Sequence, residues 1–320
     1  MSLRTPLTER LAIEHPVLLA PMAGVSGGRL AAAVSAAGGL GIVGGGYGDR
    51  DWLTAELAAA GNVPVGVGFI TWSLAKQPAL LDLALERAPK AIMLSFGDVG
   101  PFAHKVKRAK IPLICQIQNL AQTKEVIGEG ADIVIAQGTE AGGHGARRAT
   151  LPLVPAVVDL AGAVPVVAAG GIADGRGLAA ALMLGAAGVL CGTAFYVSAE
   201  SLAHPNLKRT AVAGHGDDTL RSSVIDVARD IDWPDAFNIR TLRNAFVDEW
   251  AGDLDGLRSH RAREQARYAK ARDAGDSSVS AVIVGEGIDL IHAEAGAGEI
   301  VRAMVAGAEA RLKAAAGYLA

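Results

Sequence analysis

One histidine differs from the other ionisable residues of this 320-residue sequence in what surrounds it. His144 lies in the stretch AQGTEAGGHGARRAT (136–150), shortly after the apolar run 133–136 and among glycines. An imidazole titrates near neutral pH, so it can remove a proton from a substrate carbon. A lone histidine in an arbitrary loop is more often a solvated surface residue, and the surroundings must decide between these interpretations.

Two glycine-containing turns have the composition of a phosphate site. Gly170 and Gly171 follow the apolar run VPVVAA, and Gly192 and Thr193 follow GVLC. Backbone N–H groups at glycines can approach phosphate oxygens, a helix N-terminus adds partial positive charge, and the Thr hydroxyl can donate one more hydrogen bond. Because both turns follow strand-like runs, we favour phosphate binding over a purely conformational role.

The other candidate site residues are neutral. Gln116 and Gln137 lie at the ends of apolar runs, and each amide can both donate and accept at the edge of a flat heterocycle. Met22 offers a soft apolar surface beside such a ring. The expected strand ends have no carboxylate pair, no lysine and no cluster of metal ligands. This pattern indicates a cofactor that brings its own reactivity, and flavin mononucleotide (FMN) fits best.

Eight apolar runs alternate with Ala- and Leu-rich helical patterns and must position these residues. The predicted strands are 16–22, 40–45, 63–70, 91–96, 112–118, 132–138, 164–172 and 188–195. Such a repeat, at about 25 residues, predicts an α/β fold of the (β/α)₈ TIM-barrel type, with a doubly wound sheet as the alternative. A match to G-x-G-x-x-G at 39–44 follows a helix and runs into a strand, the reverse of a dinucleotide site. In a barrel, the residues above fall on the catalytic face.

The composition of the chain becomes more polar after the eighth predicted strand. We expect residues 1–200 and 298–320 to form the barrel, and the more polar segment 201–297 to be a mostly helical insertion. The final amphipathic pattern GEIVRAMVAGAEARLKAAAGYL predicts a helix that returns to the barrel wall.

Composition and charge exclude several classes of function. A net charge of −3 and a pI near 6.2 give no electrostatic basis for binding nucleic acid or an anionic membrane. Cys115 and Cys191 lie in separate apolar runs, which predicts buried free thiols in a reducing compartment. No signal-peptide pattern or apolar run of membrane-spanning length occurs, so we expect a cytoplasmic protein.

Several motifs together resemble the nitronate monooxygenases, formerly called 2-nitropropane dioxygenases. They are APMAGVSGG (20–28), AQGTEAGGH (136–144), VPVVAAGGIADGRGLAAALMLGAAGV (164–189) and GTAF (192–195). The similarity covers the first 200 residues and extends through IRTLRNAFVDEW (239–250). The E-A-G-G-H run with the A-A-G-G-I strand is shared with flavin-type enoyl-acyl-carrier-protein reductases and certain NAD(P)H:quinone reductases.

The resemblance implies a TIM barrel that binds FMN and oxidises nitronates or nitroalkanes with O₂. It implies that His144 is the catalytic base and that the other residues bind the flavin: Ala20 and Met22 along it, Gln116 and Gln137 at its ring or ribityl chain, Gly142 and Gly143 alongside, and Gly170, Gly171, Gly192 and Thr193 at its phosphate. Many members have Asn where this chain has Gly68, and this departure leaves the substrate subclass open.

Two alternatives remain at this point. One is a reductase that takes hydride from NAD(P)H, and the other is a flavin-binding barrel without turnover, against which His144 and its glycine pair argue. As partners we expect a small nitronate or nitroalkane and O₂, with a homodimer as an open option, and neither nucleic acid nor a membrane. We expect no metal site.

Overall fold

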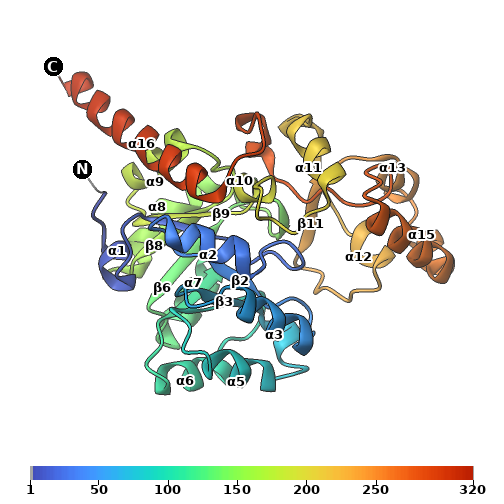
Figure 1. Ribbon diagram of the computed structural model, residues 1–320, viewed down its shortest axis with the longest axis horizontal. Helices are drawn as coiled ribbons and strands as arrows, with labels where there is room; N and C mark the ends of the chain where they lie inside the picture. The colour runs from blue at the N-terminus through green and yellow to red at the C-terminus, as the bar shows by residue number, and fades with distance from the viewer. Residues whose placement is uncertain (1–2, 320) are drawn as a thin grey trace.

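Eight parallel strands form the centre of the computed structural model, which describes residues 3–319 (Figure 1). Their order in the sheet is β1-β9-β8-β6-β5-β4-β3-β2, and a parallel bridge between Leu18 and Leu40 joins the two edges into a barrel. The strands are β1 (Val17–Leu19), β2 (Ile42–Gly44), β3 (Gly66–Ile70), β4 (Ile92–Ser95), β5 (Leu113–Ile117), β6 (Ile133–Gln137), β8 (Val166–Ala169) and β9 (Gly188–Cys191). The predicted TIM barrel is confirmed.

Alternation along the strands decides which residues reach the cavity. In β5, Leu113, Cys115 and Ile117 pack toward the surrounding helices, whereas Ile114 belongs to the apolar cluster inside the barrel. The period of two therefore brings Gln116 to the inside, one step nearer the C-terminal end of the strand. The same alternation puts Gln137 of β6 above Ile135. The polar residues thus occupy the last inward position of their strands.

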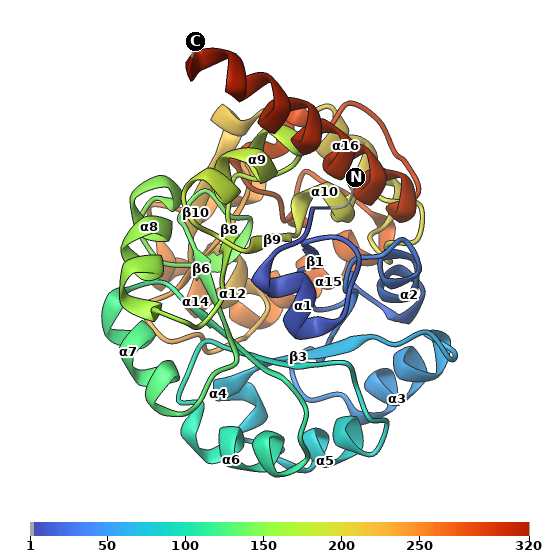
Figure 2. The same ribbon diagram turned by 90° about the vertical axis from the view of Figure 1, so that its left-hand side faces the viewer.

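Helices surround the barrel and close its N-terminal end (Figure 2). Leu7 and Leu11 of α1 join the interior cluster, so α1 plugs the end opposite the predicted site. The bounds are α1 (Pro6–Leu11), α2 (Gly28–Ala36), α3 (Arg50–Ala59), α4 (Thr71–Leu74), α5 (Ala79–Leu85), α6 (Gly100–Arg108), α7 (Leu120–Gly128), α8 (Thr150–Ala161), α9 (Gly175–Met183), α10 (Thr193–Tyr196), α16 (Ala297–Ala315) and the 3₁₀ turn η3 (Ala316–Leu319).

The last long helix packs against helices of the barrel wall. Helix α16 packs against α9 and α2, and its C-terminal part projects from the body (Figure 1). A Cβ atom at Gly175 would lie 2.4 Å from the backbone nitrogen of Ala308. Glycine at the start of α9 is therefore what lets the two helix backbones approach so closely.

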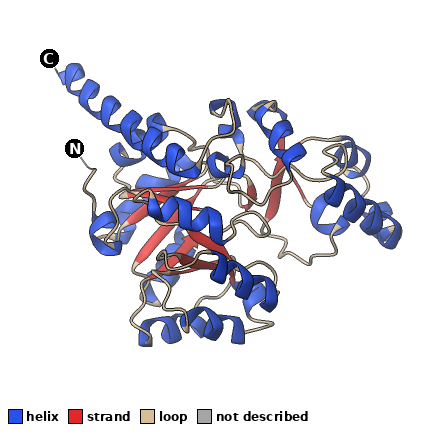
Figure 3. Ribbon diagram, viewed as in Figure 1, coloured by secondary structure: helices blue, strands red, loops and turns tan. Residues whose placement is uncertain are grey.

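The segment between α10 and α16 differs in part from the mostly helical expectation. It contains α11 (Pro205–Val212), η1 (Gly216–Asp218), α12 (Val224–Ala228), α13 (Ala245–Trp250), α14 (Leu254–Ser259), α15 (Arg261–Ala274) and η2 (Glu286–Leu290), and also the strands β10 (Thr219–Ser222) and β11 (Asn238–Leu242). These strands form an antiparallel ribbon, and β11 pairs with a further short strand, β7 (Gly143–Gly145). Figure 3 shows this second group of strands beside the barrel.

Pairing with β7 explains why the ribbon was not predicted. β10 and β11 are short and half polar, and their third strand comes from the glycine-rich stretch after β6 rather than from a neighbouring part of the chain. The ribbon therefore joins the insertion directly to the stretch that contains His144.

Both cysteines are buried and unpaired, as predicted. Burial raises the pKa of Cys115, on β5, and of Cys191, on β9, to about 12, so neither thiol is ionised at neutral pH. Across residues 3–319, no helix has the length and apolar character needed to cross a membrane.

Candidate functional site

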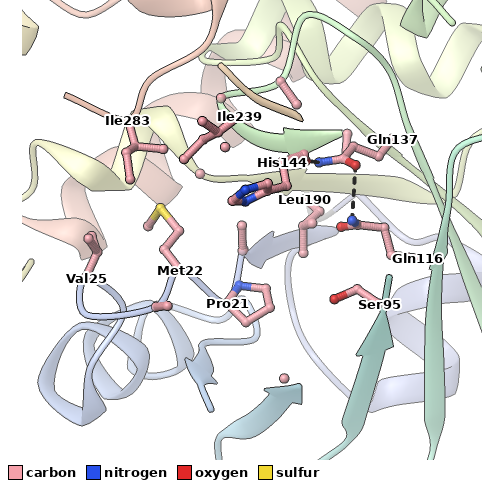
Figure 4. A pocket seen from close by; sticks show the side chains of 18 of the residues that line it. Pro21, Met22, Val25, Ser95, Gln116, Gln137, His144, Leu190, Ile239 and Ile283 are labelled. Carbon is pink, nitrogen blue, oxygen red and sulfur yellow. Dashed lines mark hydrogen bonds between the residues drawn. The ribbon is translucent and has the colours of Figure 1, made fainter. Parts of the chain in front are cut away.

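A single cavity at the C-terminal ends of the barrel strands brings together every candidate site residue that the sequence predicted. Figure 4 labels four of them, Met22, Gln116, Gln137 and His144. His144 lines it, together with Ala20, Met22, Gln116, Gln137, Gly142, Gly143, Gly170, Gly171, Gly192 and Thr193. Residues from the insertion complete the wall, among them Arg229, Trp233 and Ile239. The cavity therefore lies between the barrel and the insertion.

The two glycine-containing turns form one end of the cavity. Gly170 and Gly171 adopt positive φ angles of 107° and 71°, which only glycine tolerates readily. Within residues 3–319, the backbone N–H groups of Gly171, Gly192 and Thr193 donate to no protein group. Unpaired donors that converge on a cavity are the arrangement that a phosphate group would satisfy.

The Thr193 hydroxyl is held in place by the insertion. Its oxygen accepts a hydrogen bond of 2.9 Å from the backbone N–H of Gly285, so its hydrogen stays available for an acceptor in the cavity. The start of α9 is less available, because the side chain of Asp174 accepts from the N–H groups of Arg176 and Gly177. Donors at this end therefore come from Gly171 and from the first residues of α10.

A chain of three glutamines forms the wall beside this end. Gln137 Nε2 donates to the carbonyl oxygen of His144 at 3.0 Å, because a carbonyl can only accept. Gln137 Oε1 must then face Gln116 and Gln118, whose Nε2 atoms donate to it at 3.1 and 2.9 Å. One backbone carbonyl thus fixes the orientation of all three amide groups. Gln116 keeps its Oε1 free to accept a hydrogen bond in the cavity.

His144 is the central residue of β7 and not part of an open loop. Its backbone pairs with Ile239 of β11, and its ring stacks on Trp233 with centroids 3.5 Å apart and planes at 9°. Nε2 lies 3.0 Å from both carboxylate oxygens of Asp226. Burial lowers the pKa of His144 below its usual value, and Asp226 opposes this shift without reversing it. The imidazole is therefore neutral at neutral pH.

Two arginines from the ribbon hold the stretch that leads to His144. Arg221 donates to the carbonyl oxygens of Thr139, Ala141 and Gly143 at 2.9 to 3.2 Å. Arg240 donates to Thr139 as well, at 3.0 Å. Burial lowers the pKa of Arg221 to about 10. Sequence reasoning missed both residues, since they lie opposite each other only once the ribbon has formed.

The mouth of the cavity is aromatic and holds one cation. Tyr47, Phe96 and Trp233 line it, and their rings contact one another and those of Trp72 and Phe237. Trp233 Nε1 donates to the Tyr47 hydroxyl at 3.1 Å, and the Arg229 guanidinium carbon lies 5.4 Å from the Tyr47 ring centroid. Arg229 is the one permanently charged side chain among the residues that line the cavity. The mouth therefore favours anions.

The glycine pair before His144 has a reason that the sequence did not indicate. A Cβ atom at Gly142 would lie 2.5 Å from the carbonyl carbon of Val284 and 2.6 Å from the nitrogen of Gly285. Gly143 has a φ of 75°. Gly142 is thus required for close packing against the insertion, whether or not a bound ring also passes it.

Gly68, the departure from the family pattern, faces Pro21. A Cβ atom at position 68 would lie 2.4 Å from Pro21 Cβ and 2.5 Å from Pro21 Cγ. Both residues line the cavity. Pro21 therefore occupies the room that an asparagine side chain at position 68 would need.

The comparisons with known proteins agree with this geometry. The family model described as nitronate monooxygenase matches residues 4–93 and 75–307. The chain belongs to the nitronate monooxygenase family. This agrees with the resemblance that the motifs indicated.

Two relatives are similar to this chain over most of its length. A nitronate monooxygenase of Neurospora crassa is 31% identical over 349 residues, covering 94% of this chain and 91% of the relative. A (3aS,4S,5R,7aS)-5-hydroxy-7a-methyl-1-oxo-octahydro-1H-indene-4-carboxyl-CoA dehydrogenase of Rhodococcus jostii is 38% identical over 228 residues, which cover 70% of this chain. The chain spans just under two thirds (64%) of that relative's length.

Among solved structures, FabK from Thermotoga maritima is similar over nearly the whole molecule. It gives a TM-score of 0.86 at 30% identity, covering 98% of this chain and 99% of FabK. The likeness includes the insertion as well as the barrel, because the two together make up the covered length.

Proposed function

We propose that this protein oxidises nitronates and nitroalkanes with O₂ to a carbonyl compound and nitrite, using FMN. The observation that carries the proposal is one cavity that combines a set of unpaired backbone donors, a neutral histidine and a single cation. Family membership supplies the reaction class.

The residues present fit FMN. Gly171, Gly192 and Thr193 would hold a phosphate group through N–H groups that no described protein group uses, and the Thr193 hydroxyl would add a donor. The free Oε1 of Gln116 would accept from an N–H at the edge of a flat ring, and Met22 offers an apolar contact. When bound, FMN would supply the capacity to take electrons from the substrate and pass them to O₂.

The chain's own side chains supply binding and proton transfer. Arg229 would attract an anionic nitronate to the part of the cavity that is lined by Tyr47, Phe96 and Trp233. His144, neutral and 8% exposed, can take the α-proton that a nitroalkane must lose and that a nitronate lacks. Its position inside β7 keeps the imidazole on the cavity wall.

A dehydrogenase or NAD(P)H-dependent reductase is the second candidate. It is favoured by the Rhodococcus relative, whose name states a dehydrogenase activity. Cytoplasmic location and a homodimer stay predictions, and the oligomeric state can be read by light scattering of the purified protein.

Anaerobic mixing distinguishes the candidates. We expect purified protein to be yellow, to release FMN on denaturation, and to bleach with propionate 3-nitronate but not with NADH or NADPH. Fast bleaching with a nicotinamide nucleotide and none with the nitronate would establish the reductase instead. Release of FAD, or a colourless protein that does not take up FMN, would refute the cofactor assignment.

A further inference from the structure

The carboxylate of Asp226 is buried and has one side-chain partner. Asp226 lies on α12, is 4% exposed, and places both oxygens 3.0 Å from Nε2 of His144. Among residues 3–319, no other side chain donates a hydrogen bond to this carboxylate. A buried carboxylate without a donor is costly, so Nε2 of His144 must carry a hydrogen.

This requirement fixes the tautomer of the neutral imidazole. With the hydrogen on Nε2, Nδ1 keeps its lone pair, and no described protein group hydrogen-bonds to Nδ1. His144 lines the cavity, as the view of the site shows (Figure 4). The ring is also held by stacking on Trp233, and its backbone carbonyl is held by Gln137. The free nitrogen is therefore available to a ligand in a fixed orientation.

We propose that Asp226 is a positioning residue that presents Nδ1 of His144 as the proton acceptor for a neutral carbon acid. The inference rests on the proposed function and narrows it: the site is built to accept nitroalkanes as well as nitronates, because a nitronate has no α-proton to remove. In this step the C–H bond breaks, its electron pair stays on the substrate as the nitronate, and an N–H bond forms at Nδ1.

The charged groups around His144 show how Asp226 contributes to the basicity of the imidazole. Before the transfer the pair carries one negative charge, and afterwards imidazolium and carboxylate form a neutral pair in a buried place. Arg221 of β10 and Arg229, next to α12, both disfavour the imidazolium. Asp226 is the group that favours it, through both its hydrogen bond and its charge. Removing the carboxylate should therefore lower the pKa of His144 further and weaken it as a base.

The kinetic test compares two substrates in one variant. In the flavin-loaded enzyme, Asp226→Asn should lower kcat/KM for nitroethane by about 10²-fold, within the range known for partners that orient a catalytic histidine. The value for ethyl nitronate should stay within about threefold, since no proton is removed. Asp226→Glu should recover part of the nitroethane activity. Asp235→Asn, an exposed aspartate of the same segment, is the matched control and should behave as wild type.

A second measurement does not depend on turnover. In protein labelled with ¹⁵N-histidine, the His144 signal, assigned by its loss in His144→Gln, should show Nε2 protonated and Nδ1 bare. The His144 titration should move to lower pH in Asp226→Asn. In Asp226→Glu, which keeps a carboxylate, it should stay near the wild-type range, and this comparison serves if Asp226→Asn does not fold.

The outcomes separate this inference from the proposed function. If the wild type is inactive on both substrates, the proposed function is refuted. The NMR measurement of the His144 tautomer would still test whether Asp226 orients the ring. Equal losses on nitroethane and ethyl nitronate at normal flavin content would overturn the positioning role and leave Asp226 as a contact that docks the insertion. A wild-type His144 with the hydrogen on Nδ1 would overturn it as well.

Discussion

The two ends of the cavity are built in different ways. The glycine end consists of backbone N–H groups from turns that directly follow β8 and β9. The histidine end consists of side chains, and its parts come from β7, α12 and the β10–β11 ribbon. One end depends on the local conformation of short turns, and the other depends on contacts between the barrel and the insertion. The difference predicts which substitutions affect cofactor binding and which affect proton transfer.

The largest effect is expected at the histidine end. His144→Ala should lower kcat/KM for nitroalkanes by about 10²–10⁴-fold, the usual contribution of a positioned general base. Activity on nitronates should fall far less, and FMN content should not change. His104→Ala, on the exposed side of α6, is the matched control. Steady-state rates with nitroethane and ethyl nitronate measure both effects. Unchanged rates on both substrates would show that His144 is not the general base and has only a structural role.

The next effect is expected at the glycine end. Gly171→Val places a branched residue at a φ of 71°, with its Cβ 3.3 Å from Glu140 Cβ, beside one of the unpaired N–H groups. Loss of a few charge-assisted hydrogen bonds should weaken FMN binding by about 10²–10³-fold. Quenching of FMN fluorescence on titration with apoprotein measures the affinity.

A matched variant separates backbone strain from loss of the phosphate site. Gly162, at the end of α8, has a φ of 59° and open space where a Cβ would lie, and it is not among the cavity residues. Gly162→Val should therefore destabilise the protein without changing FMN affinity. If both variants bind FMN equally well, the phosphate does not lie at Gly171.

An intermediate effect is expected where the insertion holds the stretch before His144. Arg221→Met removes the donors to three carbonyl oxygens at Thr139, Ala141 and Gly143. A displaced His144 should lower kcat/KM for nitroalkanes by about 10- to 10²-fold, because small misplacements of a catalytic group are that costly. Arg258→Met, on exposed α14, controls for loss of a cation. Wild-type kinetics in Arg221→Met would show that the pairing of β7 with β11 alone is sufficient to hold His144 in place.

The same contrast explains what the sequence could predict. The barrel strands and both glycine turns follow from patterns a few residues long, since apolar alternation and turn glycines act locally. Asp226 and Arg221 lie 82 residues from the groups they bind, at His144 and Thr139. Nothing in a polar segment marks which of its many charges will be buried. These partners become visible only when the ribbon positions them.

The smallest effect is expected inside the barrel, at the position where this chain departs from the family pattern. Gly68→Asn puts a Cβ against two atoms of Pro21, at 2.4 and 2.5 Å, and a proline ring has no freely rotating side-chain bond by which to move away. Overpacking of this kind should lower the free energy of unfolding by about 1–3 kcal/mol. Pro21→Ala should rescue it poorly, because alanine keeps the nearer of the two atoms, Cβ. Pro21→Gly removes both, so Gly68→Asn should cost less in that background, giving a favourable coupling in a double-mutant cycle of urea unfolding. Equal costs in all three backgrounds would mean that neighbouring strands adjust around position 68, and that Pro21 is not what keeps asparagine out. In that case this part of the barrel wall would be able to adjust to a larger residue.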